Sequence, residues 1–231
     1  MTARYAVFFA PSKASPWWAF GAHWLGRDEH EDIPLVQPPL TQIAPDELWE
    51  ITAAPRRYGF HATLKAPFSL GGGHTVDDLT ARLHRLAATL KPVLLGPLQA
   101  SVLGNFVALV PVQATQELLA LASTCVTELD DLRAPLSGAD LKRRRIEHLD
   151  AREEELLQAY GYPYVLERFQ FHFTLSGPLD PQSAQQVQQA VAAPVVQLNA
   201  SSPLVLDRLC LFVESVPGQP FKRLADAPLS A

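Results

Sequence analysis

The chain has 231 residues, of which 48% are hydrophobic and 19% are charged, and its 19 Lys and Arg against 24 Asp and Glu give a formal net charge of −5. A chain of this length forms one large domain or two small ones, and it buries enough surface to need no disulfide or metal for stability. The acidic balance argues against a protein that holds long nucleic acid, but it leaves room for a small anionic substrate in a local positive pocket.

Cysteine usage and hydropathy both point to the cytoplasm. Cys125 and Cys210 are far apart and lack CxxC spacing, so we expect two buried thiols in a reducing compartment. The apolar run Tyr5–Ala10 is too short for a signal-peptide core and is followed by Pro11. No segment approaches the roughly 18 apolar residues of a membrane span, so the sequence predicts a soluble cytoplasmic protein without a membrane partner.

The first half of the chain mixes strands with capped helices. The predicted elements, in order, are a buried strand over 4–9, a tryptophan-rich helix over 15–25 capped by Ser15, a long polar loop over 26–45, a short helix from Pro45, a strand within 59–70, a helix over 75–90 with a capping box of Thr75 and Asp78, and strands over 93–103 and 106–112. The dipeptide Gly104-Asn105 predicts a tight turn between the last two strands.

The second half repeats this mixture. We expect helices over 115–132, 138–145, 150–160 and 181–191, a strand over 169–176, and closing strands over 195–199, 204–214 and 221–224. Strands mixed with helices, together with hairpin signals and few βαβ spacings, predict an α+β fold with antiparallel sheets.

One motif is written twice in the chain. GFHATLKAPFSL occupies residues 59–70 and QFHFTLSGPLD occupies residues 170–180, so each contains Phe-His-x-Thr-Leu with a proline four residues after the threonine. Each copy is followed by a predicted helix and then by strands. A diverged repeat that is present only twice predicts two similar lobes rather than a solenoid.

Strand alternation places the polar residues of both copies on one face. His61, Thr63 and Lys65 share a face in the first copy, and His172, Thr174 and Ser176 share a face in the second. The phase is identical in the two copies, which favours a shared function for the histidines over two separate structural roles.

Phosphoryl transfer suits these residue types better than the alternatives. The motif offers no carboxylate or thiolate at zinc-ligand spacing, and no GxSxG sequence or triad arrangement is present. One neutral imidazole can take a proton from an attacking oxygen while a protonated one gives a proton to the leaving oxygen, and threonine hydroxyls can donate to the non-bridging oxygens. Because histidine titrates near pH 6.5, both protonation states are accessible at neutral pH.

The two H-x-T-L motifs in a duplicated α+β chain resemble the two-histidine (2H) phosphoesterase superfamily, which includes cyclic nucleotide phosphodiesterases and RNA 2′,5′-ligase-like proteins. The stretches RYAVFFAP, WWAFGAHWLGRD, RRYGFHATLKAPF and FQFHFTLSGPL are similar to a branch of phosphonate-metabolism-associated proteins. The resemblance implies a single bilobal domain over 1–231 with two antiparallel sheets, helices outside, and a cleft between pseudo-symmetric lobes centred on 56–112 and 169–224. It also implies that His61, Thr63, His172 and Thr174 are the catalytic and phosphate-binding residues.

Several further residues are candidates for substrate binding. Arg57 and Tyr58 directly precede the first motif, Lys65 and Ser176 end the polar faces of the two motif strands, and Tyr5 lies on the first strand. The basic run 142–145 is either a solvated helix face or a collector of anionic substrate. We expect no counterparts of Lys65 and of the Arg-Arg-Tyr before the first motif beside His172, so the first lobe is expected to recognise the asymmetry of the substrate.

The leading hypothesis is a metal-independent and cofactor-independent phosphoesterase that hydrolyses a small cyclic or 2′,5′-linked ribose phosphodiester, within phosphonate metabolism. The expected partner is a small phosphorylated substrate rather than long nucleic acid, and the expected assembly is a monomer. An RNA 2′,5′-ligase or RNA-end phosphodiesterase, and a binding protein that holds a nucleotide or phosphosugar without turning it over, remain as alternatives. The exact substrate, the bond cleaved and which histidine is the base stay open.

Overall fold

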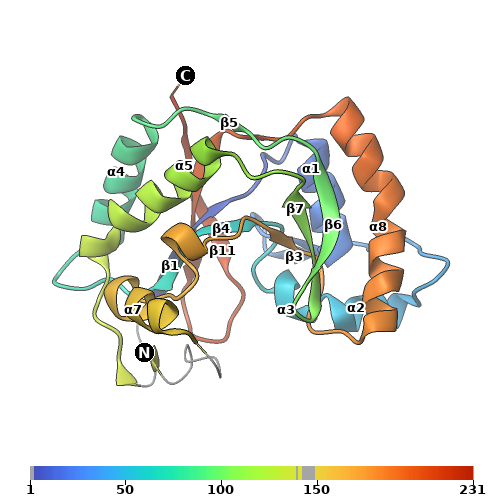
Figure 1. The fold of residues 1–231 in the computed structure, drawn as a ribbon, viewed down its shortest axis with the longest axis horizontal. Helices are drawn as coiled ribbons and strands as arrows, with labels where there is room; N and C mark the ends of the chain where they lie inside the picture. Colours follow the sequence, from blue (N-terminus) through green and yellow to red (C-terminus); the bar gives the residue numbers. More distant parts are fainter. Residues whose placement is uncertain (1–2, 139, 142–148, 231) are drawn as a thin grey trace.

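The computed structural model describes residues 3–138, 140–141 and 149–230 as a mixed α+β fold around one large antiparallel sheet (Figure 1). Its seven strands are β1 (Arg4–Phe9), β4 (Ala62–Phe68), β6 (Leu98–Leu103), β7 (Phe106–Pro111), β8 (Phe173–Thr174), β10 (Arg208–Glu214) and β11 (Lys222–Pro228). They lie in the order β11-β10-β1-β4-β8-β7-β6. The α+β class is confirmed, but the expectation of two separate large sheets is wrong, because β4 and β8 pair with each other and join all seven strands.

The longer helices begin where the sequence places capping residues. The α-helices are α1 (Pro16–Leu25), α2 (Pro45–Ile51), α3 (Ala53–Arg56), α4 (Val76–Ala87), α5 (Gln116–Thr127), α7 (Ala151–Tyr160) and α8 (Pro181–Ser201), and two short 3₁₀ helices are η1 (Asp130–Leu132) and η2 (Leu166–Arg168). Ser15 accepts a hydrogen bond from Trp17 N at the start of α1, and Thr75 and Asp78 form the predicted capping box of α4. Both interactions satisfy backbone donors that the first helical turn leaves unpaired.

Two short strand pairings lie outside the large sheet. Strand β2 (Arg27–Asp28) pairs with β3 (Ile33–Pro34) inside the segment that was expected to be a loop. Strand β5 (Val93–Leu94) pairs with β9 (Val205–Leu206), so the segments that enter the two outer hairpins touch each other.

The large sheet has one face covered by helices and one that carries the histidines. Figure 1 shows α4 and α5 on one side of the molecule and α8 on the other, with the strands between them. Side chains from α1, α4, α5 and α8 form one continuous core with residues such as Val7, Leu64 and Phe173. The alternate residues of β1 and β10 point the other way, where Phe8, Phe212 and their neighbours form a separate small cluster.

The order of elements after each motif strand is the same. Strand β4 is followed by α4, β5 and the hairpin β6–β7, while β8 is followed by α8, β9 and the hairpin β10–β11. Helix α4, which follows β4, packs against the hairpin β10–β11 that follows β8. Helix α8, which follows β8, packs against the hairpin β6–β7 that follows β4. This exchange interlocks the elements that follow β4 with those that follow β8, so each set depends on the other for its core.

The structure corrects two predicted elements. Residues 195–199 are helical, because α8 continues past Pro194 with a buried stripe of Val187, Val191 and Val195 that keeps helical spacing. That stripe outweighs the lost hydrogen bond of an exposed proline and the β-propensity of the valines. Strand β8 is also shorter than the predicted 169–176. Most of the helix predicted over 138–145 lies outside the described residues.

Two general expectations can be compared with the structure. Cys125 and Cys210 are unpaired and buried, and burial raises the pKa of each thiol to about 12, so both stay protonated. Across the part of the chain that the structure describes, no helix combines the length and apolarity needed to cross a bilayer.

Candidate functional site

The two motif segments meet in the middle of the sheet. Ala62 of β4 pairs with Phe173 of β8 in antiparallel orientation. Continued by one residue, an antiparallel pairing brings His61 alongside Thr174. One residue in the opposite direction, the pairing brings Thr63 alongside His172, whose charge is close enough to lower the pKa of His61. The sheet therefore gathers both histidine–threonine pairs from sequence positions that are far apart.

Both imidazoles are held in the same way. His61 Nδ1 lies 2.9 Å from the carbonyl oxygen of Gly59, and His172 Nδ1 lies 2.7 Å from that of Gln170. A carbonyl only accepts, so each ring carries its proton on Nδ1 in the neutral form and leaves Nε2 for proton exchange. Thr63 Oγ1 lies 3.4 Å from Nε2 of His61. The two copies of the motif therefore favour the same tautomer of their histidines, with the proton on Nδ1.

The surroundings of both histidines favour the neutral form. Burial lowers the pKa of His61 to about 4, with His172 adding to the effect and the bond to Gly59 opposing it. Burial also lowers the pKa of His172, against the opposing bond to Gln170. In the absence of a bound anion, the site therefore favours two neutral imidazoles at neutral pH.

A cavity of about 380 Å³ opens over the two motif strands. Its lining includes His61, Thr63 and Thr174, and His172 lies next to it against the lining residue Phe106, with ring centroids 5.8 Å apart. The walls are mostly apolar, and they are formed by Phe8, Ala54, Pro55, Tyr58, Ala66, Pro67, Phe106, Tyr162, Gly177 and Pro178. A partly apolar pocket of this size with a few convergent polar groups is typical of a small-molecule site.

Tyr58 forms one wall of this cavity, as predicted from its place before the motif. Its ring stacks on Phe221 with centroids 4.9 Å apart and lies 5.6 Å from the ring of His61. Arg27 fixes this segment from behind by donating hydrogen bonds to the carbonyl oxygens of Arg56 and Arg57. The contact with substrate remains a prediction, but the ring is held beside the candidate base.

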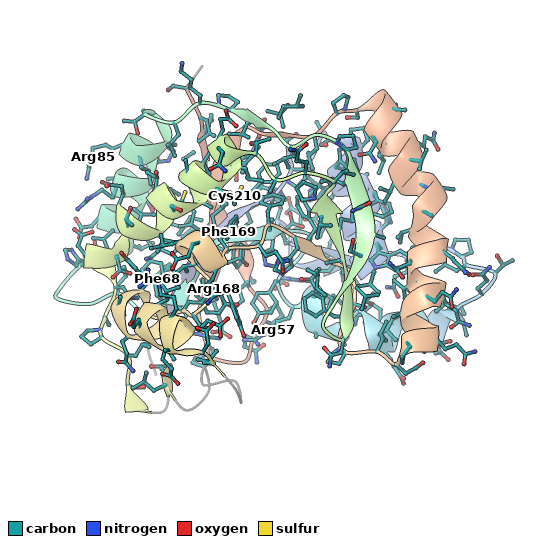
Figure 2. All side chains as sticks on the ribbon, viewed as in Figure 1. Arg57, Phe68, Arg85, Arg168, Phe169 and Cys210 are labelled. Atoms are coloured by element: carbon teal, nitrogen blue, oxygen red, sulfur yellow. The ribbon has the colours of Figure 1, made fainter. Side chains whose placement is uncertain are left out.

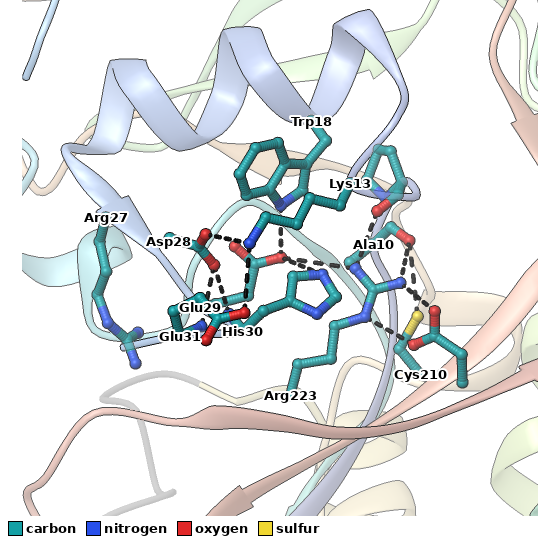
Figure 3. A network of polar contacts seen from close by, with 12 residues as sticks. Ala10, Lys13, Trp18, Arg27, Asp28, Glu29, His30, Glu31, Cys210 and Arg223 are labelled. Carbon is teal, nitrogen blue, oxygen red and sulfur yellow. Dashed lines mark hydrogen bonds and ion pairs between the residues drawn. The ribbon is translucent and has the colours of Figure 1, made fainter. Parts of the chain in front are cut away.

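A polar network around Glu29 and Arg223 (Figure 3) packs against Gly59, two residues before the first histidine. Gly59 adopts a φ of +79°, and a Cβ there would lie 2.7 Å from Cβ of Glu29. Glu29 is fully buried, accepts a 2.9 Å hydrogen bond from Trp18 Nε1 and lies 3.5 Å from Arg223 Nη1. Because Gly59 supplies the carbonyl that orients His61, this packing fixes the direction of the imidazole.

Lys65 corrects the simple alternation argument. Its side chain is 3% exposed, and its Nζ donates to Asp130 at 2.8 Å and to the carbonyl oxygen of Val126 at 3.0 Å, on the helix-covered side of the sheet. The register of β1 with β4 shifts twice, between Val7 and Phe8 and between Tyr5 and Val7. A bulge adds a residue and reverses which face the next side chain occupies, so Lys65 does not share the face of His61.

Three other candidates for substrate binding make contacts with the rest of the protein. Ser176 lines the cavity, yet its Oγ accepts from Val107 N and donates to Gly177 O, so its hydroxyl is used by the backbone. Tyr5 packs against the helix-covered core rather than the cavity. Arg57 is bound to Glu214 and to the carbonyl oxygen of Gln219. The basic run 142–145 lies outside the described residues.

The expected asymmetry between the copies is smaller than predicted. Arg168 and Phe169 stand at the same distances before His172 as Arg57 and Tyr58 do before His61, so the statement that this segment has no counterpart is wrong. Arg57 and Arg168 both lie near the middle of the view in Figure 2. Arg168 binds Asp150 at 2.5 Å.

The repeated motif also contains a signal for two further cavity residues. Pro67 and Pro178 each follow a motif threonine by four residues, and both line the cavity. Phe8 and Phe106 also line the cavity. Alternation of side chains along β1 and β7 places both on the face of the sheet that carries the histidines. Tyr162 follows the glycine that ends α7 and had no signal in the motif.

Metal coordination finds no support among the residues described. Within that part of the chain, no group of three or more histidines, cysteines, aspartates or glutamates is arranged to hold a metal ion. The donor set around the cavity is instead two imidazoles and hydroxyls.

Comparisons with known proteins give a family and two long relatives. The model of the family described as "Protein of unknown function (DUF1045)" matches residues 63–222. The chain is 38% identical over 230 residues to a ribose 1,5-bisphosphate phosphokinase PhnN of Janthinobacterium sp. (strain Marseille), a match that covers 98% of this chain and 51% of that protein. It is 36% identical over 219 residues to a protein of the same name from Laribacter hongkongensis (strain HLHK9), which covers 95% of this chain and 50% of that protein. The chain spans about half the length of these relatives.

Proposed function

This chain belongs to the DUF1045 family of proteins of unknown function, and we propose that it is a phosphoesterase that opens a small cyclic ribose phosphodiester by histidine acid–base catalysis. One observation carries the proposal. Both imidazoles donate Nδ1–H to a carbonyl two residues earlier, which leaves both Nε2 atoms for proton exchange; His61 and the two threonines line one cavity, and His172 lies beside it against the lining residue Phe106. This set matches the needs of phosphodiester hydrolysis, in which one proton is taken and one is given.

We assign the role of general base to His61. With a pKa lowered to about 4, it is neutral at physiological pH and can accept a proton from the attacking water through Nε2. His172 then acts as the general acid, and the negative charge of the bound phosphodiester stabilises its protonated form. Thr63 and Thr174 donate hydrogen bonds to the non-bridging oxygens.

The step balances without a metal ion. The water oxygen forms a bond to phosphorus, the bond from phosphorus to one ribose oxygen breaks, and the product is an acyclic phosphomonoester. His61 takes the water proton and His172 gives its proton to the ribose oxygen, so solvent must exchange protons with both rings before the next turnover. Each proton transfer is typically worth about 10²–10⁴ in rate.

The relatives suggest the class of substrate. They are named for phosphorylation of ribose 1,5-bisphosphate, which is a ribose with two phosphomonoesters. Opening a cyclic phosphodiester on a ribose phosphate yields a molecule of that kind, so hydrolysis here would precede such a kinase step. The resemblance to phosphonate-metabolism proteins points to the same class of phosphoribosyl compound.

Kinase activity is the second candidate, because the relatives carry that name. The sequence argues against it, since it contains no G-x-x-x-x-G-K-[ST] loop for nucleotide phosphates. The match to about half of each relative is consistent with a kinase activity that resides in the other half. We expect no ATP-dependent phosphorylation of ribose 1,5-bisphosphate by this chain, and phosphorylation by the purified protein would favour the kinase.

The test is a panel of ribose cyclic phosphates and 2′,3′-cyclic nucleotides, followed by ³¹P NMR. We expect turnover of at least one member, and a loss of about 10²–10⁴ in kcat for His61→Ala and for His172→Ala. Thr63→Ala and Thr174→Ala should cost less, because each removes one hydrogen bond to a charged group. His84 is exposed on α4, so His84→Ala serves as the matched control and should keep full activity.

Three outcomes separate the alternatives. Full activity in both histidine variants would refute the acid–base assignment. Tight binding of a cyclic phosphodiester without product would favour the binding protein. Strong RNA affinity with a steep dependence on salt would favour the RNA enzyme, which the net charge of −5 argues against.

A further inference from the structure

A buried carboxylate near the cavity has more cationic partners than its charge requires. Glu214 is fully buried at the end of β10, and its two oxygens accept hydrogen bonds from Arg4 Nε and Arg57 Nη2. Gly218 N also donates to it at 2.8 Å. Burial opposes ionisation, but the hydrogen bonds from Arg4 and Gly218 still hold the pKa of Glu214 below its usual value. Two guanidinium groups on one carboxylate leave a net charge of about +1.

The two arginines also have hydrogen-bond donors to spare. Arg57 Nη1 and both terminal nitrogens of Arg4 find no acceptor among the residues described here. The side chains are 30% and 15% exposed, respectively. A single arginine would be enough to neutralise Glu214, so the second one is not explained by the needs of the carboxylate.

The cluster adjoins the cavity on the histidine face of the sheet. Arg4, Ala6 and Phe8 alternate onto one face of β1, and Phe8 contacts the ring of His61 with centroids 4.0 Å apart. Arg57 Cζ lies 5.3 Å from the ring centroid of Tyr58, which is the wall shared with His61.

A second contact leads along the same face. Pro67 lines the main cavity and also the small neighbouring depression that Arg4 borders. Arg4 and Arg57 each lie 5.8 Å from the ring of Phe221, so the two guanidinium groups flank one aromatic ring. The charged cluster therefore continues the cavity beyond Tyr58.

We propose that Arg4 and Arg57 form a second anion subsite, which binds a phosphomonoester on the part of the substrate distant from the reacting diester. The proposal rests on the proposed function only for the identity of the reacting end. A guanidinium fork with free N–H groups matches phosphate oxygens, and this contact would orient the sugar before the cyclic ester meets the histidines.

Binding of ribose 5-phosphate, with ribose as the neutral control, tests the subsite by isothermal titration calorimetry. We expect the phosphate to raise affinity by at least about 10-fold. Arg57→Gln and Arg4→Gln should each remove this gain, because the remaining arginine is then consumed by Glu214. Both variants keep one cation on the carboxylate, so they should fold. Glu214→Gln should tighten binding, because the charge of the cluster rises.

The opposite signs distinguish a ligand site from a structural ion pair. If Glu214→Gln weakens binding as much as the arginine variants do, the cluster is structural and the proposal is wrong. Arg208→Gln is the matched control, since Arg208, on β10, is another partly buried arginine with carboxylate partners. This variant should bind ribose 5-phosphate as tightly as the wild type does. If ribose 5-phosphate no longer binds to the double variant Thr63→Ala/Thr174→Val but still binds to Arg57→Gln, the phosphate lies at the histidines and the proposal is wrong.

Turnover gives an independent comparison. Adenosine 2′,3′-cyclic phosphate and its 5′-phosphorylated counterpart share the reacting group, and we expect kcat/KM to be higher for the latter by about 10-fold or more. Arg57→Gln should bring the two values together. If both substrates react equally in the wild type, the proposed subsite is wrong while the proposed function stands. If neither substrate reacts but ribose 5-phosphate binds through the arginines, the subsite stands and the proposed function is wrong.

Discussion

The protonation state of His61 can be tested without knowledge of the substrate, through the dependence of stability on pH. The pKa of this ring is lowered to about 4 in the folded protein, whereas an unfolded histidine titrates near 6.5. As pH falls below about 6.5, the unfolded chain takes up a proton that the folded chain refuses. The free energy of unfolding must therefore fall with pH until the folded ring also titrates, at about 4.

The size of the effect follows from the two pKa values. Between pH 7 and pH 5 this one group should lower the free energy of unfolding by about 2 kcal/mol, and the complete loss below pH 4 should be about 3 kcal/mol. His61→Asn removes the titration but keeps a donor at the position of Nδ1 for the carbonyl of Gly59. The variant should thus lose about 2 kcal/mol less stability than the wild type between pH 7 and pH 5.

The assay is urea unfolding of both proteins at the two pH values, followed by the fluorescence of the buried residues Trp17 and Trp24. Titrating groups that do not interact with His61 cancel in the double difference, whereas its coupling with His172 stays within the measured term. His84→Asn, at an exposed histidine of α4, should show the pH dependence of the wild type. If the wild type and His61→Asn lose the same stability, the ring is not held neutral and the assignment of His61 as the base loses its physical basis.

Four further outcomes are expected. The kcat/KM for a cyclic phosphodiester should be bell-shaped with its maximum on the acidic side of neutrality, because the base loses its proton near pH 4 and the acid is neutralised below its usual 6.5; a maximum above pH 7 would contradict this. Gly59→Ala should destabilise the fold by about 1–3 kcal/mol and lower kcat, because the new Cβ meets Glu29 at a positive φ, which thermal unfolding and kinetics can measure. Lys65→Met should lower the melting temperature while leaving KM unchanged, because the lysine binds Asp130 away from the cavity; a raised KM would return it to the site. EDTA should leave activity intact, and a loss that a divalent ion restores would end the metal-free mechanism.

The local signals in the sequence predicted the elements well where backbone chemistry decides them. Ser15 and Thr75 begin helices because their side chains satisfy free N–H groups, which depends only on neighbouring residues. The common face of the two histidine–threonine pairs was also predictable, because a period of two and a repeated phase are local properties, whereas their catalytic role stays a prediction. The pairing of β4 with β8 was not, since the partner of a strand depends on contacts between residues far apart in the chain.

The errors at the site have specific causes. The predicted face of Lys65 was wrong because the bulge in β4 is not encoded in the alternation of apolar and polar residues. Ser176 lines the cavity, but the sequence does not reveal that its hydroxyl accepts a hydrogen bond from the N–H of Val107. Pro67 and Pro178 could have been found, because a residue repeated at a fixed distance from a catalytic candidate carries the same information as the candidate itself.

The exchanged packing of the helices bears on how selectivity can arise. Strands β4 and β8 share a single paired position, Ala62 with Phe173, yet α4 packs on β10 and β11 while α8 packs on β6 and β7. To change the distance between the two imidazoles, both helix contacts would have to slide within one continuous core. The distance between base and acid is therefore expected to be fixed by the fold. We therefore expect substrate choice to depend on the walls, where the ring of Tyr58 lines the cavity, and on the arginine subsite proposed beyond it.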